Sequence, residues 1–184
     1  MLRRRLLLAP RAGSDASIAN PGSAIAETGY TKGVSQSVVA GVDGSELSGA
    51  VIRVAQRLAE RLELRLVLLH VAPPTEAPGV SAAVAGQQRL HEEELRDAQR
   101  LLDDLALEAG LGPDVRRRTE IGQAGDAIVA ACADENAELV VVGSRGRAGL
   151  RAALLGSVSA SVASRVACPC VVVSSQAASR PFLG

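Results

Sequence analysis

The chain has 184 residues, which is enough for one domain of ordinary size and an extension. Apolar residues make up 47% of it and charged residues 22%, which is typical of a globular protein and excludes global disorder. Twenty basic residues balance twenty acidic ones, so nucleic acid is not an expected partner, and no uncharged apolar run approaches the roughly 18–20 residues that span a bilayer.

Two details of composition limit the kinds of ligand site. The only aromatic residues are Tyr30 and Phe182, so residues 36–175 offer no ring on which a nucleic-acid base could stack. Lys32 is the only lysine, and Gly33 follows it. A Walker A loop, which needs a lysine directly before Ser or Thr, is therefore excluded.

Residues 1–35 differ from the rest of the chain. They hold five basic and two acidic residues, are rich in Ser, Gly and Ala, and contain too short an apolar run for a secretory signal. We interpret them as a disordered basic extension, or as upstream sequence added by a misplaced start.

From residue 36 onward, short apolar stretches rich in β-branched residues alternate with amphipathic stretches whose apolar residues recur at intervals of three and four. The first kind predicts strands and the second predicts helices. The expected strands are 37–42, 64–71, 115–121, 139–143 and 170–174. The expected helices are one capped by Ser45 and ending at Leu62, then 87–109, 125–135 and 156–166, with a loop over 75–85. Residues 176–184 are expected to be a flexible tail.

Uncharged strands that alternate with helices are typical of a parallel sheet covered on both faces. Because crossovers between parallel strands are right-handed, we expect an open, three-layer α/β sandwich over residues 36–175. The three arginines at 116–118 indicate that the third strand lies near an edge of the sheet.

The three cysteines have no spacing typical of a disulfide framework, which indicates a reducing compartment and hence the cytoplasm. Cys168 and Cys170 flank a proline at the start of the last strand, far in sequence from Cys132. With no further ligand nearby in the sequence, we expect the pair to be half-buried packing residues rather than a metal site.

The clearest functional motif follows the apolar strand 139–143. GSRG at 143–146 is followed, after nine residues, by GSV at 156–158, which opens a helix. Glycines at a strand end and at a helix N-terminus expose main-chain N–H groups, and such an arrangement binds phosphate without a lysine. The loop also carries three cations that would offset the charge of a polyphosphate: Arg145, Arg147 and Arg151. Each piece alone also has a structural interpretation, as a strand end, a helix cap or a solvated loop, but together they favour phosphate binding.

This G-x2-G-x9-G-[S/T] spacing, with GVDGS after the first strand and LLHV ending the second, resembles the ATP-binding branch of the universal stress protein family over about residues 36–174. The resemblance implies a flavodoxin-like, Rossmann-like sheet of five strands in the order 3-2-1-4-5. It also implies that ATP binds where the first and fourth strands lie side by side and their connections leave in opposite directions. Arg145 departs from the histidine that other members carry.

The resemblance also implies roles for single residues. Gly41 and Val42 are expected to line the adenine pocket, and the backbone of Val71 to hydrogen-bond the adenine edge. Asp43 is expected to hold the ribose hydroxyls, although it also has an interpretation as a turn and helix-cap residue. The residues expected around the phosphates, with or without a divalent ion such as Mg²⁺ or Mn²⁺, are Gly143, Arg145, Gly146, Gly156, Ser157 and Val158. No metal site made by the protein alone is expected.

Candidate catalytic groups are scarce in the sequence. His70 and His91 have no Ser or Cys partner in a recognisable motif and no metal-ligand spacing. We therefore expect an ATP-binding regulatory protein of the stress response and not an enzyme, with any ATP hydrolysis slow and incidental. Two alternatives stay open: a nucleotide-independent protein-interaction module of the same fold, and a true ATPase or nucleotidyl transferase.

The last strand, from Cys170 to Ser174, holds three consecutive valines and no charge. In the order implied by the family it lies at a sheet edge, where such a strand pairs readily with another chain. We expect a homodimer formed through this strand, as in family members. The other expected partners are an adenine nucleotide and an unidentified protein, whereas nucleic acid and membranes are not expected.

Overall fold

The computed structural model describes residues 36–74, 84–144 and 155–178, and predictions for the other residues lie outside this description. The predicted strands and helices are all present, with bounds within three residues of those expected. The strands are β1 (Ser37–Val42), β2 (Arg65–Ala72), β3 (Arg116–Ile121), β4 (Ala137–Gly143) and β5 (Cys170–Val173). The helices are α1 (Ser48–Leu62), α2 (Val84–Glu108), α3 (Ala124–Asp134), α4 (Ser157–Arg165) and α5 (Ser175–Ala178).

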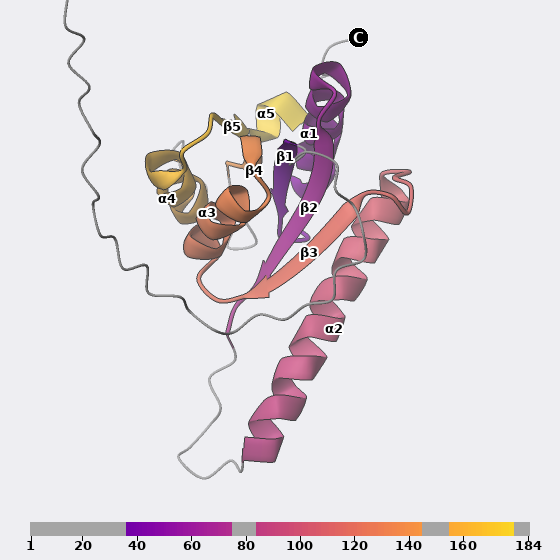
Figure 1. Cartoon of the computed structure of the whole chain (residues 1–184), viewed down its shortest axis with the longest axis vertical. Coiled ribbons are helices and arrows are strands. Elements are labelled where there is room, and N and C mark those ends of the chain that lie inside the picture. Colours follow the sequence, from indigo (N-terminus) through magenta and orange to yellow (C-terminus); the bar gives the residue numbers. More distant parts are fainter. Residues whose placement is uncertain (1–35, 75–83, 145–154, 179–184) are drawn as a thin grey trace, which may run out of the picture. The chain divides into compact units, whose positions relative to one another are not determined.

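The five strands form one parallel sheet in the order β3-β2-β1-β4-β5, which confirms the expected topology. Helices α1 and α2 cover one face of the sheet, and α3 and α4 cover the other (Figure 1). Among the described helices, none is both long enough and apolar enough to cross a membrane. Helix α2 starts at Val84, slightly earlier than expected. The first residues of the predicted flexible tail, 176–178, belong to helix α5.

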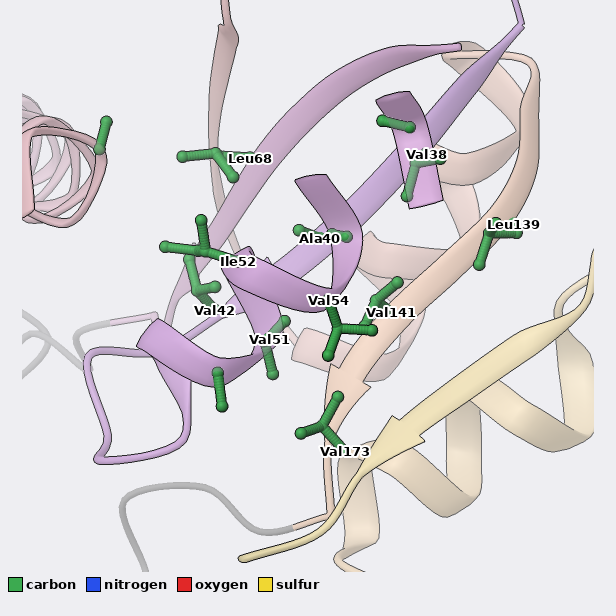
Figure 2. Packing of buried hydrophobic residues seen from close by; sticks show 14 of the residues in the cluster. Val38, Ala40, Val42, Val51, Ile52, Val54, Leu68, Leu139, Val141 and Val173 are labelled. Atoms are coloured by element: carbon green, nitrogen blue, oxygen red, sulfur yellow. The ribbon is translucent and has the colours of Figure 1, made fainter. Parts of the chain in front are cut away.

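Both faces of the sheet are packed with aliphatic side chains. Figure 2 shows the face under α1, where Ala40 of β1 and Val141 of β4 lie against Val51 and Val54 of the helix. On the other face, Val39 and its neighbours pack against Ile128 and other residues of α3. The alternation of side chains along each strand explains this division, because successive residues point to opposite faces. The core therefore needs no aromatic ring.

The start of α1 differs from the expectation that Ser45 caps it. Leu47 is the N-cap residue and makes no side-chain capping bond. The cap prediction is wrong because the chain makes an extra turn between β1 and α1, which places Ser45 before the helix. Instead, Ser48 Oγ accepts the N–H groups of Asp43 and Gly44, at 3.3 and 3.0 Å.

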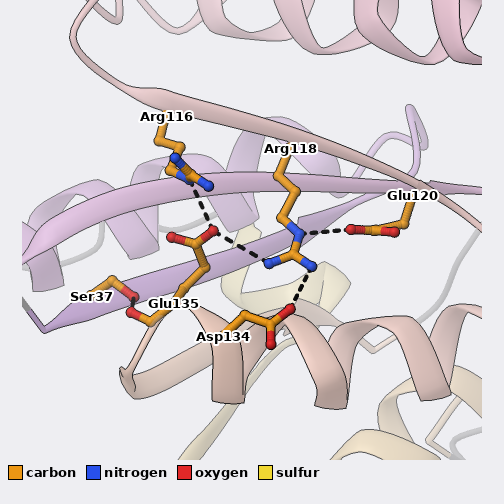
Figure 3. Close-up of polar contacts among 6 residues, drawn as sticks. All are labelled: Ser37, Arg116, Arg118, Glu120, Asp134 and Glu135. Atoms are coloured by element: carbon orange, nitrogen blue, oxygen red, sulfur yellow. Dashed lines mark hydrogen bonds and ion pairs between the residues drawn. The ribbon is translucent and has the colours of Figure 1, made fainter. Parts of the chain in front are cut away.

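The edge strand β3 is fixed to the domain by its arginines (Figure 3). Arg116 and Arg118 both donate to Glu135 Oε1, at 2.9 and 3.3 Å, and Arg118 also donates to Glu120 and Asp134, at 2.7 Å each. Burial lowers the pKa of the Arg118 guanidinium, but these two hydrogen bonds outweigh it and raise the pKa above its ordinary value. Arg116 and Arg118 thus tie β3 to acidic groups at the end of α3, while Arg117 pairs with Asp103 of α2.

Candidate functional site

A cavity of 820 Å³ opens at the carboxyl ends of β1, β2 and β4. The chain leaves β1 toward α1 on one face of the sheet and leaves the neighbouring β4 toward α4 on the other. In open parallel sheets, ligands bind at such a divergence. Eight of the residues singled out in the sequence line the cavity: Gly41, Val42, Asp43, Val71, Gly143, Gly156, Ser157 and Val158. The other two residues expected to contact the nucleotide, Arg145 and Gly146, lie outside the described residues, as do Arg147 and Arg151 of the same loop.

The inner wall of the cavity is aliphatic, and Gly41 lies where β1 and α3 approach each other. A Cβ atom added to Gly41 would meet Val142 Cγ1 at 3.2 Å and Ile128 Cδ1 at 3.3 Å, which is closer than ordinary packing contacts. A side chain at this position would therefore press on both neighbours. This close approach favours glycine at position 41.

Asp43 follows the end of β1 and combines both interpretations made from the sequence. Its Oδ1 atom accepts the Ser45 N–H at 3.0 Å and lies 3.3 Å from Ser48 Oγ, so it organises the turn that leads into α1. The residue is partly exposed and also lines the cavity. The turn thus holds a carboxylate at the mouth of the cavity in a fixed orientation.

The two halves of the glycine motif are joined by a main-chain hydrogen bond. The Gly156 N–H donates to the Ser144 carbonyl at 2.8 Å, and the Ser144 N–H donates to the Val173 carbonyl at 2.8 Å. The first bond links the residue after Gly143 to the residue before α4, and the second ties both to β5. Residues that are far apart along the loop therefore meet at the cavity.

The N-terminus of α4 faces the same cavity. Gly156 is its N-cap residue, with φ −63° and ψ 158°, and makes no side-chain capping bond. The first hydrogen bond of the helical ladder runs from the Ala160 N–H to the Gly156 carbonyl at 2.9 Å. The N–H groups of Ser157 and Val158 precede this bond, so they belong to the donors that a helix leaves unpaired within itself.

Sequence reasoning missed a second group of residues at the cavity. They come from the beginning of α3 and the inner face of α4: Gly122, Gln123, Gly125, Asp126, Ser161 and Arg165. The start of α3 reaches the cavity because it follows the end of β3, and the carboxyl ends of parallel strands share one edge of the sheet. The spacing of Ser157, Ser161 and Arg165 at intervals of four was the available sign that these three share a helix face.

The two histidines differ in environment. His70 is 5% exposed, and its Nδ1 atom lies 2.8 Å from the Val42 carbonyl oxygen, which joins the ends of β2 and β1. Because a carbonyl only accepts, Nδ1 carries the proton of this bond. His91 is exposed on α2. His70 therefore supports the cavity structurally.

All three cysteines belong to the apolar cluster on the α3 side of the sheet. Burial, together with the adjacent Cys168 and Cys170, raises the pKa of the Cys132 thiol to about 12. Burial also raises the pKa values of Cys168 and Cys170. Thiols in this state are poor nucleophiles at neutral pH. The expectation that Cys168 and Cys170 are half-buried agrees with the structure, but their proximity to Cys132 was not foreseen.

Comparison with known proteins gives a consistent result. The family model of the universal stress protein family matches residues 35–174. A universal stress protein of Mycolicibacterium smegmatis is 30% identical over 141 residues; the match covers 74% of this chain and 47% of that protein, so the chain spans about half the length of this relative. Universal stress protein UspA from Lactobacillus plantarum has the same fold, with a TM-score of 0.61 at 20% identity over 75% of this chain and 97% of its own.

A third similar protein is a universal stress protein solved in complex with cAMP. It is 29% identical to this chain, with a TM-score of 0.51, and the match covers 76% of this chain and 96% of that one. The family match extends over the whole sheet, from β1 to β5, and over the cavity described above. This chain belongs to the universal stress protein family.

Proposed function

We propose that this protein binds an adenine nucleotide, ATP in the first place, and regulates a stress response without being an enzyme. The hydrogen bond from the Gly156 N–H to the Ser144 carbonyl carries the proposal, because it holds both halves of the glycine motif at the cavity. The 29%-identical universal stress protein solved with cAMP supports it. That ligand and ATP share adenine, ribose and phosphate.

The phosphates are assigned to the side of the cavity formed by the end of β4 and the start of α4. The Ser157 and Val158 N–H groups would donate to phosphate oxygens, and the dipole of α4 would favour their negative charge. Glycines at 143 and 156 leave room for the main chain to approach the ligand closely. Arg145 and Gly146 complete the proposed phosphate site.

The adenosine moiety is assigned to the side formed by β1 and β2. Pairing between these strands ends at Val42 and His70, so Val71 lies beyond the end of β1. Its backbone is the proposed partner of the adenine edge, while Gly41 and Val42 border the ring. The aliphatic wall suits a flat base, since pockets without aromatic side chains can hold adenine by apolar contact. The Asp43 carboxylate would accept from the ribose hydroxyls.

A divalent ion would accompany the nucleotide rather than occupy a site built by the protein. Among the described residues, no cluster of three or more metal-ligating side chains is present. Mg²⁺ commonly binds through substrate phosphates and only one or two protein carboxylates. We therefore expect Mg²⁺ or Mn²⁺ to arrive with ATP and to be held chiefly by its phosphates.

We further propose that the protein acts in the cytoplasm as a homodimer joined through β5 and contacts an unidentified protein partner. The apolar strand Cys170–Val173 lies at an edge of the sheet, opposite the charged edge strand β3. Exposed N–H and C=O groups along such an edge favour pairing with a second copy.

Nucleotide binding is tested first on the protein as purified. Denaturation followed by chromatography of the supernatant should release an adenine nucleotide, and added ATP with Mg²⁺ should raise the melting temperature. A ligand at a hundred times its Kd stabilises by about 2.7 kcal/mol, which shifts Tm by several degrees. No released nucleotide and no shift at millimolar ATP would refute the proposal.

Gly156→Ala separates the proposed function from its alternatives. Any residue can adopt the φ and ψ angles of Gly156, so the variant should fold. Its added methyl group should obstruct the phosphate site. Gly49→Ala in α1, whose added Cβ has only Arg53 Nη1 nearby at 3.5 Å, is the matched control. A nucleotide-independent module would show no ATP-induced thermal shift in any variant and would keep its partners in both. An ATPase would instead show turnover that Asp43→Ala abolishes.

A further inference from the structure

One face of α4 continues the proposed phosphate site into the cavity. Ser157, Ser161 and Arg165 follow one another at intervals of four residues, and all three line the cavity. Residues spaced by four lie above one another on an α-helix. This polar face therefore leads from the N-terminus of α4 to the Arg165 guanidinium.

The opposite wall is the first turn of α3, which lies unusually close to α4. A Cβ atom added to Gly125 would be 2.6 Å from Ser161 Oγ and 2.9 Å from Arg165 Nη2. A residue larger than glycine at position 125 would thus displace one or both side chains. The absence of a side chain at Gly125 gives the guanidinium its place along the cavity wall.

Three hydrogen bonds hold the Arg165 guanidinium in that place. Nη1 donates to Asp126 Oδ1 at 2.5 Å, Nη2 donates to Ser161 Oγ at 2.6 Å, and Nε donates to the Ser161 carbonyl at 3.2 Å. The side chain of Arg165 is 44% exposed and that of Asp126 is 66% exposed. An ion pair with this exposure adds little to the stability of a fold. Stability alone therefore gives no reason for the arrangement.

The charges around the cavity show what this arginine can recognise. Among the described residues that line the cavity, Arg165 is the only Lys or Arg, while Asp43 and Asp126 are both acidic. A polyphosphate in such a cavity requires a cation, and the planar guanidinium binds phosphate oxygens through two parallel N–H donors. The Asp126 carboxylate competes with a phosphate for the same donors.

We propose that Arg165 is a specificity-determining residue that binds the terminal phosphate group of the nucleotide, and that Asp126 holds it in position until the ligand displaces that ion pair. This inference rests on the proposed nucleotide binding and adds the part of the site that distinguishes nucleotides by their phosphates. On this basis, Arg165 adds to the gain in affinity from adenosine to ATP that the N-terminus of α4 provides.

The test compares the binding of ATP and of adenosine, by calorimetry, to the full chain and to Arg165→Gln. Charge-assisted hydrogen bonds of this kind make a tenfold or greater loss of ATP affinity the expected result, with adenosine affinity changed less than twofold. Arg165→Lys keeps the positive charge but lacks the two parallel N–H donors of the guanidinium. It should therefore recover part of the lost ATP affinity. Asp126→Asn should bind ATP severalfold more tightly, because it removes the competing carboxylate.

Arg100→Gln is the matched control, since Arg100 forms an exposed ion pair with Asp97 on α2, away from the cavity. Its affinities should equal those of the unmodified chain. Equal losses for ATP and adenosine in Arg165→Gln, or no loss for ATP, would overturn the inference while leaving nucleotide binding intact. If the unmodified chain binds neither ligand, the proposed function itself fails and the inference falls with it.

Discussion

At the scale of single residues, some polar side chains of this chain are buried among apolar neighbours. His70 joins two strand ends through one hydrogen bond to the Val42 carbonyl, and the Cys132 thiol lies among aliphatic side chains. Neither group is arranged for acid–base or nucleophilic chemistry. Arg165 and Asp126 differ from these groups, because their side chains border the cavity and form an exposed ion pair there.

Cys132 should make the protein less stable at alkaline pH. Burial raises its pKa from 9.0 to about 12, so the folded protein holds this proton at pH values where the unfolded chain has lost it. The stabilisation is complete below pH 9 and is lost as the pH rises through about 12. Urea unfolding between pH 7 and 11 should therefore show a free energy of unfolding that falls above about pH 9.

The chain has one lysine and one tyrosine, so the main other groups that titrate in that range are Cys168 and Cys170, whose pKa values are also raised. Cys132→Ala should be less stable at neutral pH, since it loses a packed sulfur, but its stability should fall less steeply above pH 9. An unchanged slope in Cys132→Ala would show that other groups cause the alkaline effect.

At the scale of elements, the two edge strands of the sheet differ in charge. β3 carries Arg116, Arg117 and Arg118, and all three form ion pairs with carboxylates from other elements or from β3 itself. Charge on an edge strand discourages pairing with another sheet. β5 carries no charge and, within the described part of the chain, pairs with β4 as its one neighbouring strand. The two edges of the sheet thus differ in their ability to accept a further strand.

Glu135 should account for much of the attachment of β3. It is 5% exposed and bridges Arg116 and Arg118, so Glu135→Ala removes the shared acceptor of two guanidinium groups (Figure 3). We expect the variant to lose about 1.5–3 kcal/mol in its free energy of unfolding, the range for hydrogen bonds to charged groups. Guanidinium chloride unfolding measures this loss.

The matched control is Glu92→Ala, which removes an exposed ion pair with Arg96 on α2. Pairs of this kind contribute about 0–1 kcal/mol, so the control should change little. Equal losses in the two variants would mean that burial adds nothing to the Glu135 network.

At the scale of the whole molecule, the strand order decides which distant segments meet. Gly41 and Val142 are register partners although about 100 residues separate them, because β4 inserts beside β1 rather than beside β3. The same order leaves β5 as an outer strand. Both the cavity and the proposed dimer edge follow from this one choice of topology.

The assembly prediction belongs to this scale. At micromolar concentration, light scattering or sedimentation should give twice the chain mass of 18.9 kDa. Pairing of an apolar edge strand with its copy is the physical reason. A mass of one chain across the micromolar range would contradict the proposed dimer.

The sequence by itself determined the kinds and bounds of the elements, because hydrophobic periods of two and of three to four residues are local properties of the chain. It also indicated the glycine motif, whose residues act through local backbone conformation. The family resemblance added the strand order. None of these patterns shows that Ser45 lies before α1 and does not cap it. The extra turn after β1 depends on the contact between Ser48 and Asp43.

Only the tertiary structure decided which side chains share a site. Asp126 and Arg165 meet at the cavity through the packing of α3 against α4, whereas Cys132 of α3 meets Cys168 in the segment that leads into β5. These contacts join residues from separate elements, and a pattern along the chain carries no information about such distances. The physical reason is that helix packing depends on which surfaces fit together, and here the missing side chain of Gly125 sets the approach.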